Sequence, residues 1–551
     1  MAETEGGGEG SRRRHARWLV PFLCSLLGLA LLLPKPLHID DPFYLAIADQ
    51  ITRDPARPYS FVFNWWGTPQ PAYATALSPP LFSYWLALIV AAFGHSALAL
   101  HLATWVFLVV ASLATYSLAR RFTASPGVAT ALVMLSPAVL PSCNVMLDIP
   151  ALGLALAALA VHIHGEDSDR AGARAAAALL AAAAVLTKYQ AGAVCLLMAA
   201  YSLLQRRPRA LLWQAIPASA FLGWMVFSDQ VYGVPQLFAT HPLQTGGLGA
   251  RAVAYVTAFG ACAFLSPLAL AARPRRRVGF ACVGLLIVAG AAGRALQVSQ
   301  ARAETFVFLA NGALWLLAAV WPAATRADAR TERQDARFLG GWALLFPAVG
   351  AVGAPFPALR HLLPSLPALV MLALRCASPR AATWQGRASL ALCLAVTAGV
   401  GVGVALGDLQ FARAYPLAAR RVAPLGPRGH VWYLGHWGWQ YYADRAGLKQ
   451  LSAAEDFLPP GDIVVAPQEP DVQPASPRLA ARLERVSAFT VSGLLPVRTM
   501  SKAASAGFYA SPPPLVPYAF SRVPLERFMV YRVRQYPVPS PARRGALSPG
   551  T

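Results

Sequence analysis

The segment Ser11–Leu33 reads SRRRHARWLVPFLCSLLGLALLL. A cluster of arginines ends at Arg17, and an apolar block begins directly after it at Trp18. About 20 apolar residues cross the ~30 Å hydrocarbon core of a bilayer as a helix, and Lys and Arg are retained on the cytosolic side of such spans. The segment therefore predicts a membrane-spanning helix with a cytosolic N-terminus. No small-x-small cleavage site follows the block, so we expect an uncleaved span rather than a signal peptide.

The rest of the chain has the same composition. Of its 551 residues, 56% are hydrophobic and 13% are charged, and the mean hydropathy is +0.46. A soluble domain of ordinary size has no interior large enough for so much apolar surface. The formal net charge is +22, but the Lys and Arg residues form short clusters between apolar blocks rather than one basic face. This pattern predicts a lipid bilayer as partner and argues against nucleic acid.

Charge clusters fix the expected path of the chain through the membrane. Two apolar pieces lie within Pro79–Arg121, and one crossing alone places Arg120 and Arg121 in the cytosol. The piece Pro80–Phe93 is short and aromatic-rich, as an interfacial helix is. The run Ala175–Leu204 is interrupted by Lys188, which predicts two short spans joined at an outer turn. About thirteen spans result: Trp18–Leu33, Ala97–Leu118, Gly127–Leu140, Ile149–Ile163, both halves of Ala175–Leu204, Leu211–Phe227, Ala252–Leu270, Val278–Ala292, Phe306–Val320, Leu339–Val352, Leu362–Leu374 and Ala388–Leu406.

The sequence thus predicts a polytopic α-helical membrane protein with a small extracytoplasmic α/β domain at its C-terminus. The predicted parts are a disordered basic cytosolic tail at 1–17, a transmembrane domain at 18–407 with a first outer loop at 35–95, an outer domain at 408–540 and a disordered tail at 541–551. In the outer domain, the patterns of His430–Leu434, Asp462–Val465 and Phe528–Val533 predict strands, and Gln440–Gly447 predicts a helix. The Ala- and Arg-rich composition is typical of a bacterial protein, so we expect the bacterial inner (plasma) membrane.

The cysteines predict neither a metal site nor a disulfide framework. No CxxC or Cys/His ligand spacing occurs, and no cysteine follows Cys393. We expect them to be small buried apolar side chains. They are Cys24, Cys143, Cys195, Cys262, Cys282, Cys376 and Cys393.

Ionisable residues gather at the predicted outer edge of the membrane. Such residues are costly there, so each needs a reason. The acids have a simple interpretation as helix N-caps and dipole partners, Lys188 as a lysine that snorkels to the interface, and Arg360 with His361 as an interface anchor. The full set is Asp40, Asp41, Asp148, Lys188, Asp229, His241, Arg302, Glu304, Arg360 and His361.

Taken together, several ordered motifs resemble the GT-C superfamily of membrane glycosyltransferases. The resemblance is to bacterial relatives of the lipid A aminoarabinose transferases and the dolichyl-phosphate-mannose protein mannosyltransferases, and it covers most of residues 18–407. The motifs are HIDDPFYLAIADQI (38–51), SPPLFSYWLALIVAAFGHSALALHL (78–102), MLDIPAL (146–152), LTKYQAG (186–192) and RHLLPSLPALVML (360–372).

The resemblance implies an inverting glycosyltransferase. It moves a sugar from a polyprenyl-phosphate donor to a lipid, glycan or protein acceptor on the outer face, without a cofactor or a metal. Asp41 is the implied base, with Asp40 second and Asp148 as a further active-site acid. Lys188 and Arg360 are the implied cations for the donor phosphate, and the segment at Ser78 is expected to lie beside it.

Some alternatives stay open. Ser78 stands where many relatives carry lysine, so His241 or Arg251 is expected to substitute. In the aromatic stretch Trp432–Tyr442, His436 and Trp437 either bind the acceptor or belong to the domain core. A lipid or glycan transporter or flippase is a competing function, although such proteins place charges near the midplane and show repeats. A polyprenyl-diphosphate-dependent glycan polymerase or ligase is another.

Overall fold

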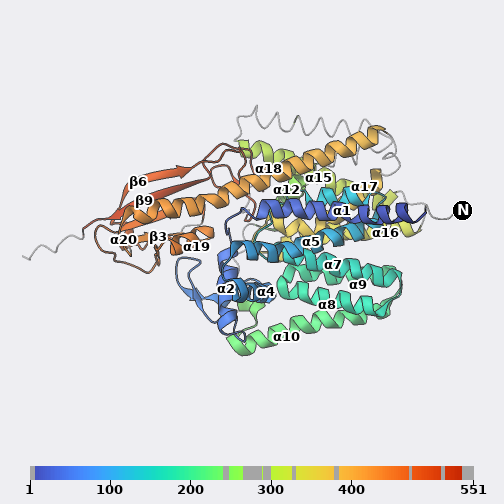
Figure 1. The fold of residues 1–551 in the computed structure, drawn as a ribbon, viewed down its shortest axis with the longest axis horizontal. Coiled ribbons are helices and arrows are strands. Elements are labelled where there is room, and N and C mark those ends of the chain that lie inside the picture. Colours follow the sequence, from blue (N-terminus) through green and yellow to red (C-terminus); the bar gives the residue numbers. More distant parts are fainter. Residues whose placement is uncertain are drawn as a thin grey trace, which may run out of the picture.

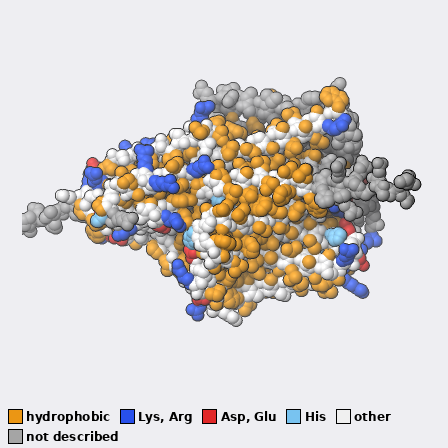
Figure 2. All heavy atoms as spheres, in the orientation of Figure 1, with side chains coloured by type: hydrophobic (Ala, Val, Ile, Leu, Met, Phe, Trp, Pro, Cys, Tyr) orange, Lys and Arg blue, Asp and Glu red, His pale blue; other side chains and the backbone are white. Residues whose placement is uncertain are grey.

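The computed structural model describes residues 6–239, 247–262, 264, 288, 300–325, 330–377, 384–427, 429–470, 474–510 and 516–535. Long helices run side by side, and a sheet-containing lobe lies beyond one end of them (Figure 1). Figure 2 shows hydrophobic side chains covering the flank of the helical part, with Lys and Arg gathered toward its two ends. An apolar belt between two charged ends is what a bilayer requires, so the chain is a multi-pass membrane protein.

Five helices of the described residues are long and apolar enough to cross a membrane. They are α5 (Ala97–Phe122), α7 (Asp148–Asp167), η2 with α10 (Pro208–Tyr232), α16 (Arg330–Gly353) and α18 (Trp384–Val422). Around them lie α1 (Gly6–Leu32), α4 (Leu81–Phe93), α6 (Pro126–Met134), α8 (Ala171–Thr187), η1 (Tyr189–Ala193), α9 (Val194–Leu204), α12 (Leu248–Cys262), α15 (Gln300–Thr325), η3 (Leu359–Ser365) and α17 (Leu366–Ala377). The number of about thirteen spans stays a prediction. The predicted span Val278–Ala292 and the end of Ala252–Leu270 lie outside the described residues.

Two predicted irregularities are present in the helical part. Helix α4 has 13 residues, or ~20 Å at 1.5 Å per residue, which is shorter than the hydrocarbon core. Helix α5, with 26 residues, is long enough to cross. Lys188 lies in an extended conformation between α8 and η1, with φ −155° and ψ 122°. The interruption at Lys188 is therefore confirmed.

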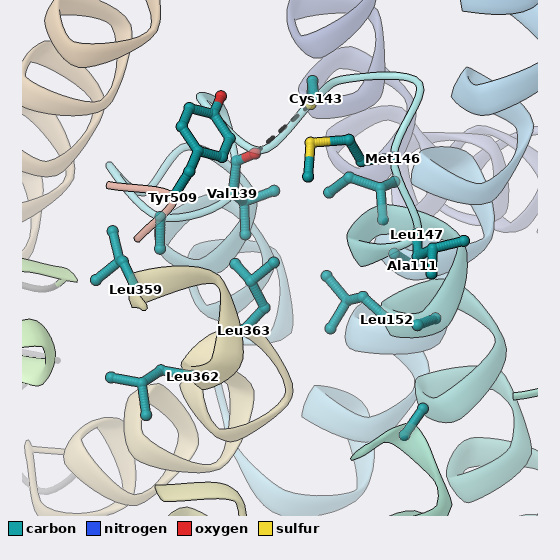
Figure 3. Close-up of a cluster of buried hydrophobic side chains, with 14 of the residues drawn as sticks. Ala111, Val139, Cys143, Met146, Leu147, Leu152, Leu359, Leu362, Leu363 and Tyr509 are labelled. Carbon is teal, nitrogen blue, oxygen red and sulfur yellow. Dashed lines mark hydrogen bonds between the residues drawn. The ribbon is translucent and has the colours of Figure 1, made fainter. Parts of the chain in front are cut away.

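The predicted span Gly127–Leu140 is correct only in its first part. Helix α6 ends at Met134, because Pro137 and Pro141 do not continue it. Residues 135–147 then follow an irregular, largely buried path. Figure 3 shows side chains of this segment lying between η3 and α7, with Tyr509 close by. Irregular backbone is tolerated at membrane depth when protein surrounds it.

The two ends of the helical domain also differ from expectation. Helix α1 begins at Gly6, so the backbone of the basic segment that we expected to be disordered is helical. Helix α18 has 39 residues, or ~58 Å, and it continues from the helical part into the lobe (Figure 1). Asp408, the predicted first residue of the outer domain, is therefore inside a helix.

The lobe contains a five-stranded mixed sheet with the order β4-β3-β5-β9-β6. The strands are β3 (Val431–Tyr433), β4 (Lys449–Gln450), β5 (Ile463–Pro467), β6 (Leu483–Val491) and β9 (Glu526–Val533), and α19 (Gly438–Arg445) follows β3. Strands β4, β3 and β5 are parallel, whereas β9 pairs antiparallel with β5 and β6. The three predicted strands and the predicted helix are confirmed. Strand β6 was not predicted because most of its side chains are exposed.

The first outer loop packs between the helices and the lobe. Its elements are α2 (Asp41–Arg53), β1 (Val62–Phe63), β2 (Gln70–Pro71) and α3 (Ala72–Thr75). The backbone N–H of Ala453 donates to the Gly67 carbonyl at 2.7 Å, and the Gln450 amide donates to the Asn64 carbonyl at 3.0 Å. These bonds attach the β1–β2 turn to the lobe. The remaining short elements are α11 (Gln236–Ala239), η5 (Ala423–Leu425), α20 (Pro477–Ala480), β7 (Met500–Ser501) and β8 (Ala506–Gly507).

Candidate active site

Four charged side chains from distant parts of the sequence meet at one end of the helices. The Lys188 ammonium lies 2.6 Å from one carboxylate oxygen of Asp148, and Arg360 Nη1 lies 3.3 Å from the other. The same Arg360 nitrogen lies 3.4 Å from Asp40 Oδ2. We call Asp40, Asp148, Lys188 and Arg360 the charge cluster. Its charges alternate along the chain of contacts, and the two cations balance the two carboxylates.

The charge cluster is largely removed from water. Exposed side-chain fractions are 4% for Asp148, 11% for Arg360, 17% for Lys188 and 23% for Asp40. Burial raises the pKa of the Asp40 carboxyl, while Arg360 acts in the opposite direction. A carboxylate with a raised pKa is a better proton acceptor near neutral pH. Asp40 is also the most exposed member of the cluster, so it is the one that a substrate reaches most easily.

A small pocket adjoins three members of the cluster. Its polar lining comes from Asp148, Lys188, Arg360 and Gln190. Its apolar lining comes from Ala151, Leu152, Ala191, Leu363 and Pro364. An anionic group bound here would meet two cations and one carboxylate, a net positive charge, in a largely buried setting where electrostatic attraction is strong.

Local structure explains how each charge reaches the cluster. Asp148 is the first residue of α7, and Arg360 lies in the 3-10 turn η3 before α17. Lys188 is placed by the break between α8 and η1. Asp40 occupies the N-cap of α2, but its side chain makes no capping hydrogen bond. The carboxylate of Asp40 is therefore directed to Arg360 rather than used as a helix cap.

Asp41 lies apart from the two cations. Its carboxylate accepts the His38 backbone N–H at 2.7 Å, and the side chain is buried. Burial raises the pKa of this carboxyl well above its ordinary value. Of the adjacent acids, the structure brings Asp40 into contact with Arg360, although the sequence favoured Asp41.

Asp41 borders a second buried group of polar side chains centred on Asp408. Lys35 Nζ lies 2.5 Å from Asp408 Oδ2, and the hydroxyls of Tyr509 and Thr499 each donate to Asp408 at 2.7 Å. Lys35 also donates to the carbonyls of Pro141 and Cys143. We call Lys35, Asp408, Thr499 and Tyr509 the anchor cluster. It joins the first outer loop, residues 135–147, α18 and the lobe.

The anchor cluster leads to a stability prediction. In Lys35→Met, Asp408 loses its buried counter-ion, so we expect the free energy of unfolding to fall by ~3–5 kcal/mol. Thermal unfolding of the detergent-extracted protein measures this loss. Lys449→Met is the control, because Lys449 is exposed on β4; it is expected to change stability by less than ~1 kcal/mol. Equal melting temperatures for Lys35→Met and the wild-type protein would contradict a structural role of the anchor cluster.

The other predicted residues take different positions. Ser78 presents its backbone carbonyl, which accepts the hydroxyl of Tyr59 at 2.7 Å and the amide of Gln236 at 3.0 Å. Arg251 is buried and donates to the carbonyls of Gly350 and Ala354. His241 lies outside the described residues.

His361 and the two lobe residues face packed surroundings. His361 Nδ1 lies 2.9 Å from the Tyr255 hydroxyl. His436 and Trp437 are 3% and 8% exposed, and the His436 ring lies 4.6 Å from that of Trp65. The rings of His436 and Trp65 therefore pack in the contact between the lobe and the first outer loop.

Similar proteins were found by sequence and by structure. Residues 78–232 match the family described as dolichyl-phosphate-mannose-protein mannosyltransferase. No curated protein sequence matches the chain significantly. The matched segment includes Asp148 and Lys188, whereas Asp40 and Arg360 lie outside it.

Three solved structures show a distant likeness. ArnT from Cupriavidus metallidurans in the apo state is 15% identical, with 94% of this chain and 98% of that chain covered and a TM-score of 0.39. The oligosaccharyltransferase from Archaeoglobus fulgidus is 12% identical, with 80% and 64% covered and a TM-score of 0.47. The arabinofuranosyltransferase AftD from Mycobacteria is 14% identical, with 94% and 40% covered and a TM-score of 0.42. At TM-scores below 0.5, these likenesses say nothing about the site.

The family match and the ordered motifs agree on the same residues. The match covers the motif that begins at Ser78, and it also covers Asp148 and Lys188. In the structure, Asp148 and Lys188 lie in one cluster with Asp40 and Arg360. Over residues 78–232 the chain is therefore similar to a family of membrane mannosyltransferases, in agreement with the GT-C resemblance of its motifs.

Proposed function

We propose that the charge cluster transfers a sugar, with inversion, from a polyprenyl-phosphate donor to a hydroxyl or amine acceptor. The observation that carries the proposal is the meeting of two cations and two carboxylates beside a pocket. The family description of residues 78–232 supports it, because that description names a dolichyl-phosphate sugar.

The reaction needs one bond to form and one to break at the anomeric carbon. The acceptor oxygen or nitrogen forms a bond to this carbon as the bond from the carbon to the phosphate oxygen breaks. Asp40 accepts the proton from the acceptor. The phosphate leaves on its lipid, and Lys188 and Arg360 stabilise the negative charge that develops on it.

Donor binding and proton transfer compete for the same contact. Arg360 contacts both Asp40 and Asp148, and Asp40 is the more exposed of these two acids. We propose that a donor phosphate takes Arg360 from Asp40. Donor binding then frees the Asp40 carboxylate for the acceptor, while Asp148 keeps Lys188 in place.

We propose that the charge cluster lies on the outer face of a bacterial inner membrane. Arg121 and Arg375 lie in the last turns of α5 and α17, where both contact Asp335. Under the positive-inside rule, this basic end of the helices is the cytosolic one. The N-terminus is then cytosolic and the lobe extracytoplasmic. Outside the cytosol a nucleotide sugar is not expected, so the activated sugar is carried on a lipid.

The product identifies the acceptor. A strain that lacks the gene is compared with strains that carry the wild-type gene or the Asp40→Asn variant. Mass spectrometry of extracted lipids, glycans and proteins is expected to show one glycosylated species that only the wild-type gene restores. If all three strains have the same glycosylated species, while vesicles containing the protein move a lipid or glycan across the membrane, the protein is a transporter and the proposal is wrong.

A further inference from the structure

A buried glutamine joins the turn at Lys188, which lines the pocket, to the segment at Ser78. Gln236 lies at the start of α11 and is 1% exposed. Its Nε2 donates to the Ser78 carbonyl at 3.0 Å and to the Ala76 carbonyl at 3.4 Å. Its Oε1 accepts the Tyr189 hydroxyl and the Trp224 indole N–H, each at 2.8 Å. The backbone N–H of Gln236 donates to Ser228 Oγ at 3.1 Å.

The partners fix the orientation of this amide. Backbone carbonyls only accept hydrogen bonds, so the NH₂ group of Gln236 faces Ser78 and Ala76. An indole N–H only donates, so the amide oxygen faces Trp224. A carboxylate in this place would direct an oxygen at two carbonyl oxygens. An apolar side chain would leave four buried or partly buried polar groups without this partner.

One of the bonded segments carries a cation of the proposed phosphate site. Tyr189 follows Lys188 directly, so the bond to the Tyr189 hydroxyl restrains the turn that carries Lys188. The Ser78 carbonyl precedes Pro79 and Pro80, which lead into α4. Tyr59 adds a second bond to the same carbonyl at 2.7 Å. Through its hydrogen bonds, Gln236 thus connects the turn at Lys188 to the segment at Ser78.

We infer that Gln236 is a positioning residue: its amide holds Lys188 where the lipid-linked phosphate binds, an inference that rests on the proposed function. Gln236 touches neither substrate nor the charge cluster, and its effect passes through Tyr189 to Lys188. A displacement of about 1 Å at a reacting group lowers rates by about 100-fold. Loss of the amide is therefore expected to weaken both donor binding and transfer without unfolding the protein.

The test is a double-mutant cycle between Gln236 and Lys188. Gln236→Met, Lys188→Gln and their combination are compared with the wild-type protein for kcat/KM with a polyprenyl-phosphate sugar. The affinity for polyprenyl phosphate alone, read as its effect on the melting temperature, is measured in parallel. Gln236→Met is expected to lower kcat/KM about 10- to 100-fold, and to cost no further activity once Lys188→Gln is present.

A matched control comes from the end of η2, just before α10. Gln214→Met removes an amide whose oxygen and nitrogen make no hydrogen bond within the described residues, so kcat/KM is expected to stay at the wild-type value. Gln236→Glu keeps the size of the side chain and is expected to fail like Gln236→Met, because it lacks the NH₂ donors.

Two results would overturn the inference. One is an additive loss in the double variant, which means that Gln236 acts independently of Lys188. The other is a wild-type kcat/KM in Gln236→Met. Failure of the proposed function has a different signature: the wild-type protein itself neither transfers sugar nor gains stability from polyprenyl phosphate, which removes the premise of the inference as well.

Discussion

Asp40→Asn is expected to lower kcat by about 10²- to 10⁴-fold, because it removes the base that accepts the acceptor proton. The substitution keeps the size of the side chain, and Arg360 keeps Asp148 as its counter-ion at 3.3 Å. We therefore expect the amount of folded protein to stay near the wild-type level. Initial rates with a polyprenyl-phosphate sugar, together with the melting temperature, separate the loss of catalysis from a loss of folding.

Two neighbouring acids serve as comparisons. Asp49 lies on the same helix, α2, and its carboxylate contacts His95 at 2.7 Å. Asp49→Asn is expected to retain wild-type kcat. Asp41→Asn is expected to act on stability, because Asp41 binds the His38 backbone rather than a cation. If Asp41→Asn folds but loses transfer while Asp40→Asn remains active, the assignment of the base to Asp40 is wrong.

Lys188→Gln is expected to lower kcat about 10²- to 10³-fold, because it removes one of the two cations that stabilise the leaving phosphate. It also leaves Asp148 with Arg360 alone, so some loss of stability accompanies it. Rates at saturating donor and thermal unfolding measure the two effects.

A charge-balanced double variant separates the two roles of Lys188. In Lys188→Gln/Asp148→Asn the buried charge is balanced again, so stability is expected to return toward the wild-type value while transfer stays low. If this double variant regains transfer, Lys188 serves only to neutralise Asp148. Lys188→Arg is the conservative comparison. It keeps the charge with a different geometry, and we expect partial activity.

The order of motifs in the sequence was sufficient to predict most of the charge cluster. Lys188 interrupts an apolar run, and Asp148 begins one, so their positions at the edge of the membrane follow from hydropathy. The pairing of Lys188 with Asp148 and of Arg360 with both acids does not follow, because hydropathy says nothing about which ends of helices adjoin.

The choice between Asp40 and Asp41 illustrates what a pattern leaves undecided. Adjacent residues at the start of a helix point about 100° apart, so one faces the cations and the other faces the interior. Which of them does so depends on the packing of α2, where Arg360 contacts Asp40 and the His38 backbone N–H donates to Asp41. Both residues are aspartates, so their chemistry does not separate them.

Residues with no sequence signal complete the arrangement. Lys35 is close to the first span and reads as an interface lysine, yet its partner Asp408 comes from α18. Gln236 is a single polar residue at the start of the short helix α11, and its importance is visible only from the four hydrogen bonds of its amide group. The irregular path of residues 135–147 does not follow from hydropathy, because Gly127–Leu140 is apolar enough to span, and the helix is ended instead by its local proline content.

Identification of the leaving group tests the central proposal most directly. The purified protein in lipid vesicles is supplied with a synthetic polyprenyl-phosphate sugar and a membrane extract that contains the acceptor. Mass spectrometry then follows the lipid product. The account predicts polyprenyl monophosphate, formed in step with the glycosylated acceptor by the wild-type protein and not by Asp40→Asn. Transfer only from a diphosphate-linked donor, or equal product with Asp40→Asn, would contradict it.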